Sequence, residues 1–146
     1  MARRREGRVE VITLSRPEAL NAVSDAMAQQ LGTAFREVAA DNDVWVVLLA
    51  AAGTKAFCVG ADLKERTGFS LNDFYGNREH VREMFAAIRA LPQPAIASTF
   101  GFVLGGGFEL ALSCDLIIAA EGTKFGLPEA RVGLLPAGGG TQLLAR

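Results

Sequence analysis

Residues 98–115 read STFGFVLGGGFELALSCD, and this stretch decides the fold. An apolar run beginning at Pro94 leads into the glycines at 105–107, and a helix-compatible segment with one acid, Glu109, follows at once. Glycine lets a backbone approach a ligand closely, and the first turn of a helix leaves its N–H groups free. The junction can therefore stabilise an oxyanion or a carbonyl. On spacing alone, tight helix–strand packing with Glu109 in water is an equal alternative.

The composition indicates one globular domain spanning residues 1–146. Half of the 146 residues are apolar, 21% are charged and the net charge is −1. A net charge this close to zero does not predict the basic surface that nucleic-acid binding requires. The one basic cluster, Arg3 to Arg5, is expected to be a frayed, solvated end. No apolar run reaches the ~20 residues of a membrane helix, so we expect no membrane partner.

The two cysteines and the single histidine exclude several kinds of site. Cys58 and Cys114 stand far apart in apolar surroundings without a CxxC motif, which favours reduced core thiols and a cytoplasmic location. One histidine, His80, excludes a His-rich metal site, and no metal is expected. It also leaves little room for a Ser/His/Asp triad, and its polar neighbours predict a surface position.

The first third of the chain alternates strands and a helix. Residues 8–15 predict a half-buried strand, and Ser24 or Asp25 caps an amphipathic helix that ends near Ala40. Residues 43–50 form a continuous aliphatic run, which predicts a strand covered on both faces. The order strand, helix, buried strand indicates an α/β fold.

The middle of the chain predicts a loop, a second helix and a further strand. Residues 51–60 are rich in small residues and predict a loop, after which Asp62 suits a helix N-cap. Ser70 and Asp73 predict a capping box for a helix ending near Leu91. Its core-facing stripe comprises Phe74, Val81, Met84, Phe85 and Ile88. Residues 116–120 predict a short buried strand.

A second acid, Glu129, follows Pro128 at a distance of twenty residues from Glu109. Two carboxylates on neighbouring segments can divide acid and base roles, although Glu after Pro is also an ordinary helix start. The glycines at 138–140 lack the lysine of a phosphate-binding loop, and neither glycine cluster has the spacing G-x-G-x-x-G. Nucleotide hydrolysis and nicotinamide chemistry are therefore excluded.

Four segments in register resemble the crotonase (enoyl-CoA hydratase/isomerase) superfamily. They are Ser15–Ala22 (SRPEALNA), Ala56–Lys64 (AFCVGADLK), Gly101–Ala111 (GFVLGGGFELA) and Phe125–Gln142, which runs from FGLPE to GGGTQ. The resemblance implies an α/β spiral of ββα units. It also implies that the backbone N–H groups of Ala61 and Gly106 hold the carbonyl of an acyl thioester. Coenzyme A, as part of the substrate and not a separate cofactor, would lie along Ala19, Leu20, Ala22, Ala61, Asp62 and Leu63.

The two acids select the reaction that the resemblance implies. Hydratases of this superfamily carry Glu at both positions that match Glu109 and Glu129, whereas isomerases typically keep the later one. We therefore expect addition of water to a 2-enoyl-CoA, giving a 3-hydroxyacyl-CoA. The alternatives are an enoyl-CoA isomerase, another lyase of the superfamily, or a non-catalytic acyl-CoA-binding module. Residues 61–66 also resemble the methylglutaconyl-CoA hydratase branch, but the lysine-rich RNA-contacting helix of that branch has no counterpart here.

Two departures from the family pattern affect these expectations. Ala137 stands where many hydratases have glycine, so its methyl group could crowd the water pocket. The resemblance also implies that the chain is truncated before the C-terminal helices that build a trimer or a dimer of trimers. We therefore expect apolar surface to be exposed and the 146-residue chain alone to be poorly active.

Overall fold

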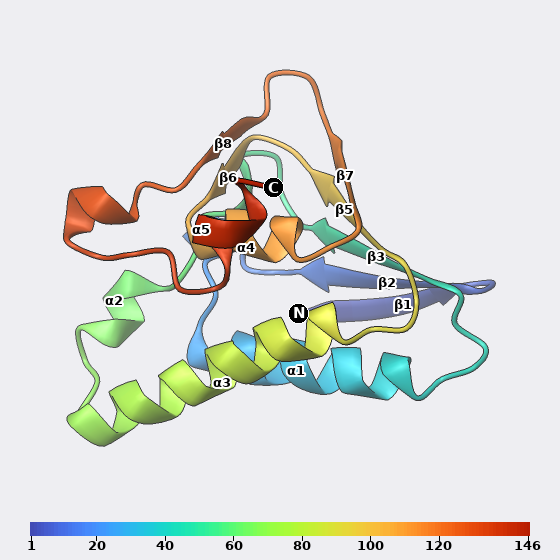
Figure 1. Cartoon of the computed structure of the whole chain (residues 1–146), viewed down its shortest axis with the longest axis horizontal. Coiled ribbons are helices and arrows are strands. Elements are labelled where there is room, and N and C mark those ends of the chain that lie inside the picture. The colour runs from blue at the N-terminus through green and yellow to red at the C-terminus, as the bar shows by residue number, and fades with distance from the viewer.

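The computed structural model describes residues 1–146 as two β-sheets with helices beside them (Figure 1). The larger sheet has the strand order β1-β2-β3-β5-β7, and the smaller has the order β4-β6-β8. The strands are β1 (Ala2–Glu6), β2 (Val9–Leu14), β3 (Val46–Ala51), β4 (Ala56–Cys58), β5 (Ala95–Thr99), β6 (Phe102–Leu104), β7 (Leu116–Ala119) and β8 (Lys124–Gly126). The helices are η1 (Pro17–Ala19), α1 (Asp25–Ala39), α2 (Leu63–Arg66), α3 (Leu71–Arg89), α4 (Gly106–Leu112), η2 (Glu129–Val132) and α5 (Gly140–Leu143).

The strands alternate between the two sheets, as the predicted spiral of ββα units requires. β3, β5 and β7 lie in the larger sheet, while β4, β6 and β8, each the next strand along the chain, lie in the smaller one. All pairs except β1–β2 are parallel. Helical segments follow each pair of strands, and those after the first three pairs return the chain to the larger sheet. The α/β spiral predicted from the sequence is confirmed.

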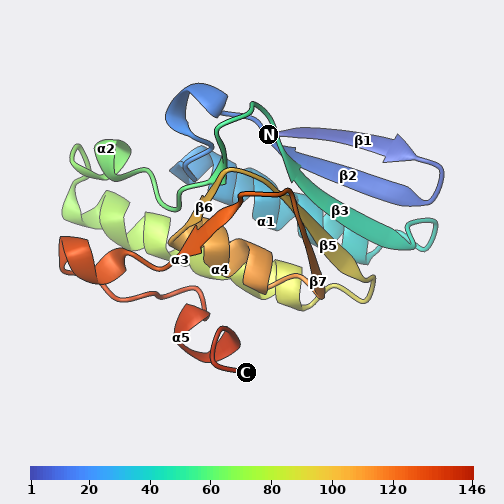
Figure 2. The ribbon, with the colours of Figure 1, turned by 90° about the horizontal axis from the view of Figure 1, so that it is seen from above.

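The core lies between one face of the larger sheet and the helices α1 and α3, which pack side by side (Figure 2), and it continues into α4 and the strands β4 and β6 of the smaller sheet. Sheet residues Leu14, Val47 and Ala97 meet Phe35 of α1 and Phe85 of α3 in one cluster of buried side chains. Both helices begin at the predicted caps. The Ser24 side chain accepts a hydrogen bond from the backbone N–H of Met27, and Ser70 forms a capping box with Asp73.

The N-terminal arginines are not frayed, which corrects the prediction for this end. β1 pairs antiparallel with β2, and Arg3 and Arg5 both form ion pairs with Glu10, a carboxylate that is 4% exposed. Arg3 also pairs with Glu37, and Arg5 with Asp41. The cluster is therefore neutralised by Glu10 on the neighbouring strand and by two acids, Glu37 and Asp41, that lie far along the chain. The strand pairing and the packing of α1 bring these acids to the arginines, so the basic run alone does not reveal them.

Three other strand predictions need correction. Residues 56–58, predicted as part of a loop, form strand β4. In β3, Val47 and Leu49 are fully buried but the alternate residues are only half-buried, so one face is covered and not both. β7 was predicted to be buried, but all four of its residues are exposed because it is the edge strand of the larger sheet.

Two side-chain placements also differ from the prediction. Phe74, expected in the core, lies in the first turn of α3 and is 38% exposed. His80, expected on the surface, is half-buried, and its Nδ1 lies 2.9 Å from Asp25 Oδ1. The capped start of α3 extends beyond the region where α1 packs on it, so helical spacing overestimated the core stripe. No helix in the chain has both the length and the hydropathy needed to cross a membrane.

Candidate active site

The loop at Val59–Leu63 and the start of α4 bring two backbone N–H groups together. A Cβ added to Gly60, whose φ is +94°, would lie 2.9 Å from the nitrogen of Gly106, so only glycine fits this contact. A Cβ added to Gly106 would lie 3.9 Å from the nitrogen of Ala61. Neither the Ala61 nor the Gly106 amide donates to a protein acceptor. The structure therefore brings together the two donors expected from the sequence.

Glu109, in the first turn of α4, is buried and held by two backbone amides. Its carboxylate is 3% exposed, and Oε1 accepts hydrogen bonds from Gly138 N at 2.7 Å and Gly140 N at 2.8 Å. Oε2 accepts no hydrogen bond from the protein and lies 4.0 Å from where a Cβ of Gly106 would be. One carboxylate oxygen is thus fixed, and the other is available beside the paired amides.

Glu129 begins η2 and faces the same region from the opposite side. Its Oε1 lies 3.1 Å from where a Cβ of Gly105 would be, and its Oε2 is buried without a hydrogen-bond partner. A buried carboxylate oxygen without a partner is costly, so it is more often found where a ligand group will meet it. Glu129 does start a helix after Pro128, as the alternative expected, and its buried Oε2 also faces the protein.

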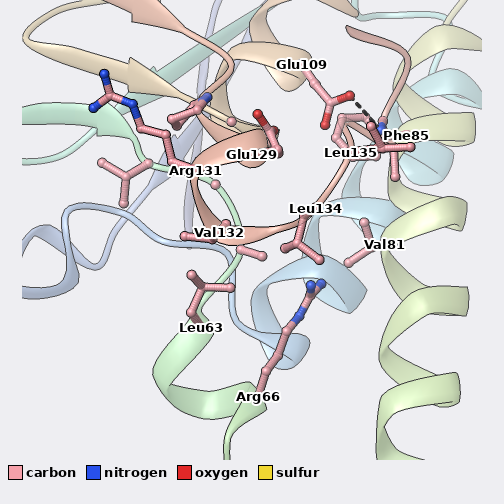
Figure 3. Close-up of a pocket in the computed structure, with 18 residues that line it drawn as sticks. Leu63, Arg66, Val81, Phe85, Glu109, Glu129, Arg131, Val132, Leu134 and Leu135 are labelled. Atoms are coloured by element: carbon pink, nitrogen blue, oxygen red, sulfur yellow. Dashed lines mark hydrogen bonds between the residues drawn. The ribbon is translucent and has the colours of Figure 1, made fainter. Parts of the chain in front are cut away.

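Both carboxylates line one cavity of about 350 Å³ (Figure 3). Figure 3 shows them on separate segments, with apolar side chains of α3 and of the chain after η2 lining the rest of the cavity. The Arg66 guanidinium borders it below, where Nε donates to Asn77 Oδ1 at 3.1 Å. The apolar lining comprises Val59, Ala61, Leu63, Val81, Phe85, Val132, Leu134, Leu135 and Ala137.

A second cavity, of about 740 Å³, shares Val59, Ala61 and Leu63 with the first. Its lining includes every residue that the sequence predicted to lie along coenzyme A, namely Ala19, Leu20, Ala22, Ala61, Asp62 and Leu63. The predicted thioester site at Ala61 is therefore where the two cavities meet. A long ligand lying in the second cavity would reach the carboxylates through this point.

Two residues that sequence reasoning missed lie in or beside the wall of this second cavity. Arg16 Nη1 donates to Ala22 O at 2.8 Å and to Asp62 Oδ2 at 2.9 Å, so one side chain joins both of its walls. Asn21 is fully buried, and its Nδ2 donates to Ala52 O and Ala56 O. Asn21 also has a φ of +55°, a conformation that asparagine tolerates better than most residues. An asparagine between Leu20 and Ala22 was the available signal.

Asp62 caps α2 and is charged under ordinary conditions. Burial raises the pKa of its carboxyl group, but the Glu65 amide, the Arg16 guanidinium and the Lys64 amide together outweigh this effect, so the pKa lies below 3.8. Asp62 therefore caps α2, as its sequence position predicted, and it also lines the second cavity.

Comparison with known proteins decides the family. Residues 4–146 match the family model for enoyl-CoA hydratase/isomerase. The chain belongs to this family. A crystal structure of enoyl-CoA hydratase from Bacillus anthracis superposes with a TM-score of 0.94 at 38% identity, covering 99% of this chain and 57% of that one.

Curated members of the enoyl-CoA hydratase/isomerase family show the same extent of similarity. The short-chain-enoyl-CoA hydratase of Clostridium acetobutylicum is 39% identical over 144 residues, which are 97% of this chain and 54% of the relative. A probable enoyl-CoA hydratase of Rhizobium meliloti is 44% identical over 146 residues, again covering 54% of the relative. The chain thus spans about half the length of the curated relatives it matches.

Proposed function

We propose that the protein adds water to the double bond of a 2-enoyl-CoA, giving a 3-hydroxyacyl-CoA. One observation carries the proposal: Glu109 and Glu129 face a single cavity beside two free backbone N–H groups. The names of the similar proteins support it, since they include a short-chain-enoyl-CoA hydratase.

Each group has one role in this reaction. A water molecule attacks C3 and loses a proton to Glu109, while the electron pair of the double bond moves through C2 onto the thioester oxygen. The N–H groups of Ala61 and Gly106 stabilise the resulting enolate, and removing one such donor typically costs ~100- to 1,000-fold in rate. Glu129 supplies the proton that C2 receives. Exchange with solvent restores both carboxyl groups, so the enzyme needs no separate cofactor.

The two hydrogen bonds that hold the Glu109 carboxylate fit its proposed role as a general base. Two amides hold Oε1, which fixes the orientation of the carboxylate without using Oε2. A base held in one orientation can take a proton without first losing rotational freedom. Ala137 also lines the cavity, but the amides that hold Glu109 belong to Gly138 and Gly140, so its methyl group does not interrupt them.

The decisive experiment measures crotonyl-CoA hydration from the loss of absorbance of the conjugated thioester. We expect slow turnover by the 146-residue chain alone and faster turnover when it is mixed with the second half of the Clostridium acetobutylicum relative. The product should carry ¹⁸O when the reaction is run in labelled water. If crotonyl-CoA binds but no labelled 3-hydroxybutyryl-CoA forms in either preparation, the protein is a binding module. Double-bond migration in a 3-enoyl-CoA without label would instead identify an isomerase.

The assembly is proposed to be a homotrimer or a dimer of trimers. Apolar side chains exposed on β7, including Leu116 and Ile118, support association. Sedimentation of the reconstituted protein should give a mass that is a multiple of three protomers, and a monomeric mass would refute the proposal.

The location is proposed to be the cytoplasm, where thiols stay reduced. Cys58 and Cys114 are both free, as this location requires. Microscopy of a tagged protein in the source cell would test it, and a signal confined to another compartment would overturn it.

A further inference from the structure

Arg89, in the last turn of α3, contacts the segment that holds Glu109. Its Nη1 donates to the carbonyl oxygen of Gly138 at 2.8 Å, across 49 residues of chain. No other protein group donates to this carbonyl. The guanidinium carbon also lies 5.7 Å from the centre of the Phe85 ring, over the same part of the cavity wall.

The position of this carbonyl explains why the contact matters. The peptide from Gly138 to Gly139 lies between the two peptides whose N–H groups donate to Glu109 Oε1. Gly139 has a φ of +117°, so the turn adopts a conformation available mainly to glycine. Three consecutive glycines leave such a peptide free to rotate unless something holds it.

The neighbouring contacts fix only one side of the turn. The carbonyl of Gly139 accepts the amides of Gln142 and Leu143, which ties it to the start of α5. The carbonyl of Gly138 has only Arg89. The Gly140 N–H belongs to the same peptide as the Gly139 carbonyl and is therefore held by α5. The Gly138 N–H has no such support, and it shares the Gly138 Cα with the middle peptide, so rotation of that peptide would turn the Gly138 N–H away from Glu109.

We propose that Arg89 is a positioning residue that fixes the turn at residues 138–140 and thereby the carboxylate of Glu109. Arg89 does not touch substrate in this proposal. Its effect on turnover rests on the proposed function, whereas its effect on the turn does not.

The first test observes the turn itself in the ¹⁵N-labelled 146-residue chain. In the unaltered protein, the amide protons of Gly138 and Gly140 should resonate at low field and exchange slowly, because both donate to a buried carboxylate. Arg89→Met keeps the aliphatic stem over Phe85 but removes the donor. We expect the Gly138 amide signal to move to higher field and its proton to exchange about tenfold faster, which corresponds to ~1.4 kcal/mol of lost protection.

Two further variants separate positioning from general stability. Arg89→Lys retains one charged donor and should recover part of the Gly138 signal position. Arg82→Met is the matched control, because Arg82 lies on the same helix but pairs with Glu79 in solvent. If Arg89→Met leaves the Gly138 and Gly140 signals and exchange rates unchanged, or if Arg82→Met shifts them equally, the proposal is wrong.

The second test measures turnover of crotonyl-CoA in the reconstituted protein. Arg89→Met should lower kcat about tenfold with little change in KM, because Glu109 acts in the chemical step and not in binding. A tenfold rise in KM with kcat unchanged would contradict positioning of Glu109. Absence of hydration by the unaltered protein would reject the proposed function, while the amide signals would still decide whether Arg89 holds the turn.

Discussion

Arg16 and Asp62 form an ion pair of 2.9 Å between segments 46 residues apart, and both belong to the wall of the proposed coenzyme A cavity. Replacing Arg16 by Ala removes this link and the contact to Ala22. We expect the dissociation constant for coenzyme A to rise about tenfold, as loss of a charged hydrogen bond predicts. Calorimetric titration would measure it. Arg8→Ala, which removes a surface pair with Asp43, should leave the affinity unchanged.

The pH dependence of the same pair follows from the direction of the Asp62 shift. Because the pKa of Asp62 is lower in the folded protein than the ordinary 3.8, its contribution to stability is fully present above that value. The contribution is lost as the pH falls below about 4 towards the folded pKa. Urea unfolding between pH 7 and pH 2 should show a loss of stability in this range that is smaller in Asp62→Asn. An identical pH profile in the variant would contradict the linkage.

The two glutamates are each expected to be essential for hydration. Glu109→Gln keeps an oxygen for the amides of Gly138 and Gly140 but removes the base. Glu129→Gln removes the proton donor at the opposite side of the cavity. Each variant should lower kcat ~100- to 10,000-fold without unfolding the protein, as loss of a general acid or base typically does. Hydration of crotonyl-CoA at the unaltered rate by Glu129→Gln would disprove its assignment.

Gly107 is a point where the fold tolerates no side chain. A Cβ added there would lie 2.3 Å from the carbonyl oxygen of Cys58, which is backbone and cannot move away cheaply. Gly107→Ala should destabilise the protein by about 1–3 kcal/mol, or more if α4 is displaced from β4. Gly76→Ala, in an open position of α3, is the control and should stabilise the helix by about 0.5–1 kcal/mol. Urea midpoints that fall equally in both variants would contradict this reading.

Both cysteines should be unreactive in the folded protein. Burial raises the pKa of Cys58 to about 12, and burial together with the neighbouring Asp115 raises that of Cys114 to about 12. At pH 8 only about one thiol in 10,000 is then a thiolate, the form that reacts. Iodoacetamide should therefore modify neither residue until urea unfolds the chain, when two sites react. Rapid modification of Cys58 in the native protein would be inconsistent with its burial.

Local sequence signals predicted the helices and several site residues well. Ser24 and Ser70 begin their helices as expected because a cap depends on groups within three or four residues. The sequence also predicted that Ala61, Gly106, Glu109 and Glu129 belong to one site, through the four segments that match a family. The structure brings these residues to a single cavity, while their catalytic roles stay predictions.

Burial and partners were predicted less well, because both depend on pairings between distant segments. The apolar residues of β7 suggested a buried strand, but the position at the sheet edge leaves Leu116 and Ile118 exposed. The basic cluster at Arg3 to Arg5 predicts a frayed end, but Arg3 pairs with Glu37 and Arg5 with Asp41, more than thirty residues along the chain.

By itself, the sequence determined the α/β class, the capped starts of α1 and α3 and the family, since these follow from periodicity, caps and motif order. Only the tertiary structure decided how Glu109 is held. The amides that bind its carboxylate come from glycines about thirty residues later, and the arginine that fixes those glycines comes from α3, before Glu109 in the chain. Hydrogen bonds between such distant segments form only when the sheets and helices pack, so no local pattern of residues encodes them.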